Sequence, residues 1–254
     1  MYNDWLKIGS FTIHGYGVMI GIGILAAFFV GERLAKKHGL SSDELDNLIF
    51  VCLITGFLGS KLTYILTNFQ DFLTRPAAYL SPDGWVVWGG IIGGLLGGYA
   101  WCRFRKLDFM AYCNLSVIIV ALAQGFGRIG CFFAGCCYGK ETTGPGIVFP
   151  EGSLAPAGVR LIPTQLISSF GDFVLFYVLY KMYEDPKTEN KTAAAYLILY
   201  SIGRFVIEFF RGDEARGFIM GLSTSQFISI IMFVIGVIIL VKYSRAKANT
   251  EGEN

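Results

Sequence analysis

Residues 85–102, WVVWGGIIGGLLGGYAWC, form a stretch of eighteen residues without a charged side chain. A helix of about 20 mostly apolar residues crosses the roughly 30 Å of hydrocarbon in a bilayer, so this stretch predicts a membrane-spanning helix. The composition of the whole chain agrees, since 54% of the residues are hydrophobic and 16% are charged. Soluble domains have about 45–50% apolar and about 25% charged residues.

Apolar runs on both sides of this stretch repeat the pattern. We predict an all-α integral membrane protein with about seven transmembrane helices, in a single polytopic membrane domain over residues 1–254. The helices are expected at roughly 15–34, 47–67, 85–102, 111–125, 164–183, 193–210 and 224–242. Strands that cross the membrane are not expected, because open sheet edges cannot be satisfied in lipid and no alternating ten-residue pattern recurs. Residues 1–13 lack the basic start of a signal peptide, so we expect the first helix to be retained.

Glycine pairs recur every four residues within residues 88–99. Small residues at this spacing let two helix backbones approach closely, which predicts that this helix packs in the centre of the bundle. A flexible or kinked helix is the alternative.

The basic residues of the loops predict the orientation. One set of loops carries eleven of them, namely Lys36, Lys37, Arg103, Arg105, Lys106, Lys181, Lys187, Lys191, Lys242, Arg245 and Lys247. The other set carries six, namely Lys7, Arg75, Lys140, Arg160, Arg211 and Arg216. Because cytoplasmic loops are rich in Lys and Arg, we expect the N-terminus outside and the C-terminus in the cytoplasm. Seven candidate site residues then lie at outer depth: Tyr16, Lys61, Trp88, Arg128, Arg204, Glu208 and Arg211.

Arg204, Glu208 and Arg211 are spaced i, i+4 and i+7 within SIGRFVIEFFRGDE. This spacing predicts one helix face for all three. Ionisable groups inside a membrane are costly and usually mark a functional site that faces the bundle interior. The alternative is a self-satisfied Arg–Glu pair that locks two helices together.

The segment AQGFGRIGCFFAGCCYGK, residues 123–140, has five glycines in eighteen residues. We expect an irregular loop here, which membrane depth tolerates only around a cavity or in the protein interior. Arg128 within it is suited to bidentate phosphate binding. With Arg204 and Lys61 it would form a cationic cluster for a phospholipid headgroup. Nonspecific contact of Arg128 with lipid phosphate is the alternative.

Cys131, Cys136 and Cys137 lie in the same segment. Their C-x4-C-C spacing is not a standard zinc pattern and no histidine is near, so we expect no metal site. A disulfide or reactive thiol, metal binding, and plain packing all stay open. A thiol beside arginines would have a lowered pKa and be more nucleophilic. Gln165, next to a helix start at Pro163 and Thr164, is a candidate inward-pointing polar residue.

Five segments resemble motifs of the prolipoprotein diacylglyceryl transferases, and they follow one another along the chain in the same order as in that family. GRIGCFFAGCCYG resembles the family signature G-R-x-G-N-F-x-N-x-E-x-x-G, and HGYGVM resembles the Y-G opening of the first helix. GFLGSKLTYIL, IPTQL and GRFVIEFFR resemble three further family motifs. The resemblance covers nearly the whole chain. It implies a multi-pass enzyme of the bacterial cytoplasmic membrane that moves a diacylglyceryl group from phosphatidylglycerol to the lipobox cysteine of a prolipoprotein.

The resemblance also implies roles for individual residues. Arg128 and Arg204 match positions that hold the lipid phosphate, and Tyr16, Gly139 and Glu208 match other functional positions. Lys61, Trp88, Gln165 and Arg211 are expected to contact substrate. The implied reaction needs no metal or organic cofactor, because glycerol phosphate is a good leaving group once its charge is neutralised. No nucleic acid is expected, since the net charge is only +2, and a monomer is the default.

Four positions depart from the family pattern. Trp88 replaces the histidine of an H-G-G motif, Cys131 an asparagine, Cys136 a glutamate, and Lys61 an arginine. Glu208 is then the candidate general base, or Cys131 or Cys136 takes over proton transfer or a transient covalent step. A non-catalytic phospholipid-binding or thiol-handling protein on the same scaffold is the alternative function.

Overall fold

The computed structural model describes residues 3–9, 11–81, 84–213, 218–219 and 221–252. The chain forms two compact units, which are Met1–Gly31 with Cys113–Asn254 (the larger unit) and Glu32–Tyr112 (the smaller unit). Two helices cross the division between them: α1 (Gly15–Lys37) and α5 (Phe109–Ala134). That the two units together form one membrane domain stays a prediction.

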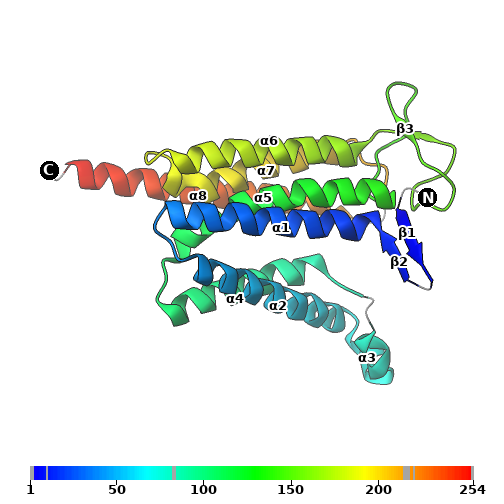
Figure 1. Ribbon diagram of the computed structural model, residues 1–254, viewed down its shortest axis with the longest axis horizontal. Coiled ribbons are helices and arrows are strands. Elements are labelled where there is room, and N and C mark those ends of the chain that lie inside the picture. Colours follow the sequence, from blue (N-terminus) through cyan, green and yellow to red (C-terminus); the bar gives the residue numbers. More distant parts are fainter. Residues whose placement is uncertain (1–2, 10, 82–83, 214–217, 220, 253–254) are drawn as a thin grey trace. The chain divides into compact units, whose positions relative to one another are not determined.

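The larger unit contains α6 (Thr164–Glu184), η2 (Glu189–Lys191), α7 (Thr192–Glu208) and α8 (Thr224–Gly252), together with most of α1 and α5. α7 packs on both α6 and α8. Short antiparallel pairs join β1 (Asp4–Ile8) to β2 (Phe11–His14), β3 (Ile147–Val148) to β4 (Arg160–Leu161), and β5 (Phe218–Ile219) to β6 (Leu222–Ser223). Figure 1 shows β1, β2 and β3 at one end of this unit and the C-terminus at the other.

The segment between α5 and α6 has a small core of its own. Phe149, Ala155 and Leu161 are buried, and Phe132 from the last turns of α5 packs against them. Ile147 of β3 is paired with Leu161 of β4. This segment is therefore folded onto the end of α5 by its own apolar contacts.

The smaller unit contains α2 (Ser42–Thr67), α3 (Phe69–Thr74), η1 (Pro76–Leu80) and α4 (Val87–Arg105). Ser41 caps α2 by accepting a hydrogen bond from the Glu44 N–H at 3.3 Å. Glycines form the contact between α2 and α4: a Cβ on Gly93 would collide with the carbonyl oxygen of Thr55, and one on Gly59 with that of Gly89. The predicted close approach of this glycine-rich helix to another helix backbone is confirmed, and its place in the centre of the bundle stays a prediction.

Each of the seven predicted segments overlaps a helix. Within the described residues, four helices or helical stretches are long and apolar enough to cross a membrane by length and composition: Gly15–Lys37, Ser42–Thr67, Phe109–Ala134 and Thr224–Ser244. Large apolar side chains on α2, such as Phe57 and Leu58, are 62% and 65% exposed. Exposed apolar surface of this extent belongs in lipid rather than in water.

The fourth segment, predicted to end at residue 125, is wrong in its boundary, because α5 continues to Ala134. Its glycines serve helix contacts instead of opening a loop. A Cβ on Gly125 would lie 2.7 Å from the ring of Phe173 in α6, and one on Gly130 would lie 3.1 Å from the ring of Tyr16 in α1. The glycines therefore let neighbouring helices approach, and the loop begins only at Gly135.

Candidate active site

The C-terminal end of α5 brings two cysteines together. Gly135 has a left-handed backbone with φ of +70°. Its N–H donates to the Phe132 carbonyl at 3.1 Å, and the Cys136 N–H donates to the Cys131 carbonyl at 3.1 Å. These two bonds form a Schellman motif, in which the residue after the glycine folds back over the helix end. The C-x4-C spacing thus places Cys136 directly beside Cys131.

Cys137 completes a cluster of three thiols. The Sγ atoms of Cys131, Cys136 and Cys137 all lie within 4.8 Å of one another. All three residues are half-buried thiols. Cys137 adopts φ of +61°, a left-handed conformation unusual for a residue with a side chain. The sequence spacing gave no reason to expect this group, and the fold creates it.

The first turn of α6 makes hydrogen bonds to the backbone of Cys136 and Cys137, the two cysteines that follow α5. The Thr164 hydroxyl donates to the Cys137 carbonyl at 2.8 Å, and Gln165 Nε2 donates to the Cys136 carbonyl at 2.8 Å. Gln165 is only 1% exposed. Its Oε1 atom accepts no hydrogen bond from the described part of the chain. Gln165 therefore positions the cysteine loop, and its predicted contact with substrate stays a prediction.

Gly139 lies where three chain segments meet. Its N–H donates to the Ile162 carbonyl at 3.0 Å, and the Lys140 N–H donates to the Phe210 carbonyl at 2.8 Å. A Cβ on Gly139 would lie 2.6 Å from the Ile162 oxygen and 2.9 Å from the Phe210 oxygen. Only glycine allows this approach, so the residue implied to be functional also has a structural reason to be glycine.

Arg211 is not on the helix face predicted for it. α7 ends at Glu208, and Arg211 forms an isolated β-bridge with Gly139. Main-chain hydrogen bonds join the segment around Gly139 to the residues after Glu208, so the helix ends before it reaches Arg211. Arg211 is 8% exposed, and its Nε and Nη2 donate to the two oxygens of Asp213 at 2.8 Å and 2.5 Å.

Arg211 also reaches the cysteine cluster. Burial opposes its charge, but hydrogen bonds with Asp213 and Cys137 outweigh this effect and raise the pKa of Arg211. Hydrogen bonds from Cys131 and Cys136, with a further one from Arg211, hold the pKa of the Cys137 thiol below its ordinary value. Hydrogen bonds with Cys131 and Cys137 raise the pKa of the Cys136 thiol, so of the two cysteines after α5 it is Cys137 that favours negative charge on sulfur.

Arg204 and Glu208 lie on one face of α7, as their spacing predicts. Arg204 Nη2 lies 2.8 Å from Glu208 Oε2, and the two side chains are 12% and 8% exposed. This ion pair is out of alignment for a hydrogen bond, so Glu208 Oε2 accepts none from the residues described. Arg204 instead donates to Ser225 Oγ of α8 at 2.7 Å. Arg204 thus links α7 to α8 and pairs with Glu208 within α7.

Arg128 has a half-buried side chain in α5. Among the described residues it has no hydrogen-bond or ion-pair partner. It interacts electrostatically with Tyr200, Cys131, Asp172 and Cys137. A half-buried guanidinium with its donors unused is a site for a bidentate oxyanion such as a phosphate.

Asp172 is a residue that the sequence reasoning missed. It lies in α6, is 7% exposed and interacts electrostatically with both Arg128 and Arg204. A single acid within the apolar run of residues 164–183 was the signal, because an acid at membrane depth is costly without a purpose. Asp172 reduces the positive charge that the two arginines place in the interior.

Tyr16 opens α1 beside the same cluster. Its side chain is 41% exposed and interacts electrostatically with the three cysteines and with Arg128. The larger unit therefore contains Tyr16, Arg128, Cys131, Cys136, Gly139, Gln165, Arg204, Glu208 and Arg211. The chemical roles expected of them stay predictions.

Lys61 and Trp88 belong to the smaller unit. Lys61 Nζ donates to the Ser81 carbonyl at 2.9 Å and lies over the ring of Trp85, 4.9 Å from its centroid. Its ammonium is thus already solvated by protein groups. Trp88, in the first turn of α4, is 37% exposed.

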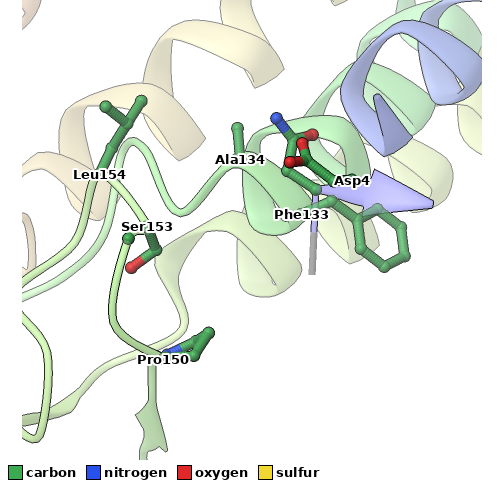
Figure 2. Close-up of a pocket in the computed structure, with 8 residues that line it drawn as sticks. Asp4, Phe133, Ala134, Pro150, Ser153 and Leu154 are labelled. Atoms are coloured by element: carbon green, nitrogen blue, oxygen red, sulfur yellow. The ribbon is translucent and has the colours of Figure 1, made fainter. Parts of the chain in front are cut away.

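A cavity of about 260 Å³ opens near the N-terminal strand. Figure 2 shows Asp4 and Phe133 on one side of it and Pro150, Ser153 and Leu154 on the other. Its lining contains no arginine, lysine or cysteine, and its charged residue is an acid. This cavity does not suit a phosphate, so the arginines and thiols remain the better candidate site.

Comparison with known proteins agrees with this arrangement. The family model described as "Prolipoprotein diacylglyceryl transferase" matches residues 4–242. A Clostridium perfringens protein named phosphatidylglycerol–prolipoprotein diacylglyceryl transferase 2 is 44% identical over 249 residues, which cover 96% of each chain. A Clostridium tetani protein named phosphatidylglycerol–prolipoprotein diacylglyceryl transferase is 42% identical over 235 residues, 92% of this chain and 94% of the relative. The chain belongs to the prolipoprotein diacylglyceryl transferase family.

Proposed function

We propose that this protein transfers a diacylglyceryl group from phosphatidylglycerol to the lipobox cysteine thiol of a prolipoprotein. The names of its relatives support both substrates. The observation that carries the proposal is Arg128, a half-buried guanidinium in α5 for which the described residues supply no hydrogen-bond partner. A lipid phosphate has the charge and geometry to occupy those donors.

The reaction is a substitution at the glyceryl carbon that is bonded to phosphate. The acceptor sulfur forms a C–S bond, the C–O bond breaks, and its electron pair stays on the departing glycerol phosphate. Negative charge grows on the phosphate oxygens in the transition state. Preorganised arginines stabilise this charge, and we assign that role to Arg128 and Arg204.

Glu208 is our candidate for the general base. Its side chain is 8% exposed and lies on the inner face of α7 with Arg204. Arg204, 2.8 Å away, holds the carboxylate in place. The histidine that the family pattern has at position 88 is a tryptophan here, so proton transfer falls to a group of this kind or to the thiol cluster. Tyr16 borders the same site.

We also propose that all seven long helices cross a bacterial cytoplasmic membrane, with the N-terminus outside and the protein acting as a monomer at the outer face. α6 and α7 carry polar residues within their spans, but several of these residues are buried: Asp172 at 7%, Ser201 at 1% and Thr192 at 0% exposure. Buried polar groups between helices are compatible with spanning. Reporter fusions after residues 38, 107, 187 and 247 would all read cytoplasmic, and a different pattern would contradict this topology.

Mass spectrometry of the acceptor tests the function. The purified protein is mixed with phosphatidylglycerol and a peptide that contains one lipobox cysteine, and the peptide is expected to gain the diacylglyceryl mass. Arg128→Ala is expected to abolish the gain. Arg75→Ala is the matched control, because its side chain is 71% exposed and pairs only with Asp71 in its own helical segment. Phosphatidylglycerol binding without any mass gain would favour the non-catalytic lipid-binding alternative.

A further inference from the structure

The three clustered cysteines have the geometry of a metal site. A zinc–thiolate bond is about 2.3 Å long, so three thiolates around one zinc lie about 3.8–4.0 Å apart. The Sγ atoms of Cys131, Cys136 and Cys137 lie within 4.8 Å of one another, so only a small contraction is needed. The Schellman motif fixes Cys131 against Cys136 before any ligand binds.

The surroundings hold these ligands in place. Thr164 and Gln165 donate hydrogen bonds to the carbonyls of Cys137 and Cys136, so the backbone of two ligands is anchored to α6. Such outer contacts orient metal ligands. Gln165 keeps a buried Oε1 atom without a partner in the described ranges.

The charges also fit. Three thiolates and one divalent cation carry a net charge of −1. Arg211 hydrogen bonds to Cys137, and Arg128 interacts electrostatically with Cys131 and Cys137. Two guanidinium groups therefore interact with the cluster, and Arg211 does so while paired with Asp213.

The number of ligands indicates the kind of metal and its use. Thiolates select zinc or copper(I) among common metal ions. Zinc prefers four ligands, and sites with three protein ligands keep the fourth position open for water or substrate. The acceptor in the proposed function is itself a thiol, which is a good zinc ligand.

We propose that Cys131, Cys136 and Cys137 bind a zinc ion whose fourth position takes the acceptor cysteine. The second half of this inference rests on the proposed function. When the acceptor thiol binds zinc, it loses its proton by way of water to the general base, because a coordinating thiol is deprotonated. The zinc-bound sulfur then attacks the glyceryl carbon, the C–O bond breaks, and its electron pair leaves with glycerol phosphate. The product is a thioether, a weaker ligand that leaves the zinc. This chemistry supplies the activated thiolate that the missing histidine would otherwise provide.

Metal analysis of the full-length protein, purified in detergent under reducing conditions, tests the site. About one zinc per chain is expected. Cys131→Ser, Cys136→Ser and Cys137→Ser should each lose it, whereas Cys113→Ser, in the same helix as Cys131, should keep it. Wild-type protein without zinc, with copper in its place, or with a disulfide inside the cluster would overturn the proposal. Because a serine variant can misfold, chelation of the wild type followed by zinc addition is the second measurement. It should lower transfer at least tenfold and then restore it.

Cobalt(II) in place of zinc reports the fourth ligand. A lipobox peptide with cysteine should change the cobalt absorption bands, and the same peptide with serine should not. Full transfer by metal-free protein would overturn the zinc site and leave the proposed function standing. Zinc bound by all three cysteines, with cobalt bands that respond to the cysteine peptide but no transfer to it, would support the site and contradict the proposed function.

Discussion

Gly139→Ala tests whether the three chain segments that meet beside the cysteine cluster need a residue without a side chain at position 139. The new Cβ would lie 2.6 Å from the Ile162 oxygen and 2.9 Å from the Phe210 oxygen, well inside contact distance. The hydrogen bonds from Gly139 to Ile162 (3.0 Å) and from Lys140 to Phe210 (2.8 Å) must lengthen to admit it. Two hydrogen bonds contribute about 0.5–1.5 kcal/mol each, and overpacking costs about 1–3 kcal/mol. The expected loss of stability is therefore about 2–6 kcal/mol.

Thermal unfolding of the detergent-solubilised protein measures this loss. A chain of this size loses roughly 2–4 °C in Tm per kcal/mol, so Tm should fall by at least about 4 °C. Gly144→Ala is the matched control, because its Cβ would meet only the Thr142 hydroxyl at 3.5 Å, an ordinary contact. An unchanged Tm in Gly139→Ala, combined with lost transfer, would refute the reasoning and place Gly139 against the substrate instead.

Three further outcomes follow from the same contacts. Glu208→Gln should keep phosphatidylglycerol binding but slow single-turnover transfer by about 10²–10⁴, the usual contribution of a general base; an unchanged rate would remove Glu208 from that role. Asp172→Asn should raise the affinity for phosphatidylglycerol, about fivefold for an interaction of about 1 kcal/mol, because the acid near Arg128 no longer repels the phosphate; weaker binding in a lipid titration would contradict this sign. Gly93→Ala should lower Tm because its Cβ would collide with a carbonyl oxygen of α2, whereas Gly21→Ala, with open space at its Cβ, should not; equal Tm values would disprove the role of the glycine contact.

Hydropathy predicted the helices well because the bilayer fixes the length of an apolar run. It could not predict where α5 ends. Glycine weakens a helix locally, but the rings of Phe173 and Tyr16 pack against Gly125 and Gly130, and this tertiary contact outweighs the propensity.

Spacing predicted the Arg204–Glu208 pair, because both residues stay within one helix. It failed for Arg211, because the backbone bonds at Gly139 are made by residues far away in the chain. Spacing did not predict the cysteine cluster, for a different reason. C-x4-C is not a metal pattern within a helix, but it is the spacing across a Schellman motif, and Gly135 directly before Cys136 was the clue.

The glycine contact between α2 and α4 has a consequence for the lipid around it. At the glycine pairs the two helices meet mainly through backbone and small side chains. Ile91, Ile92, Leu95 and Leu96, which alternate with the glycine pairs of α4, are 53%, 58%, 59% and 62% exposed. These branched side chains are therefore available to contact acyl chains. The protein can thus offer an apolar surface to successive two-chain lipids while the contact between α2 and α4 stays unchanged.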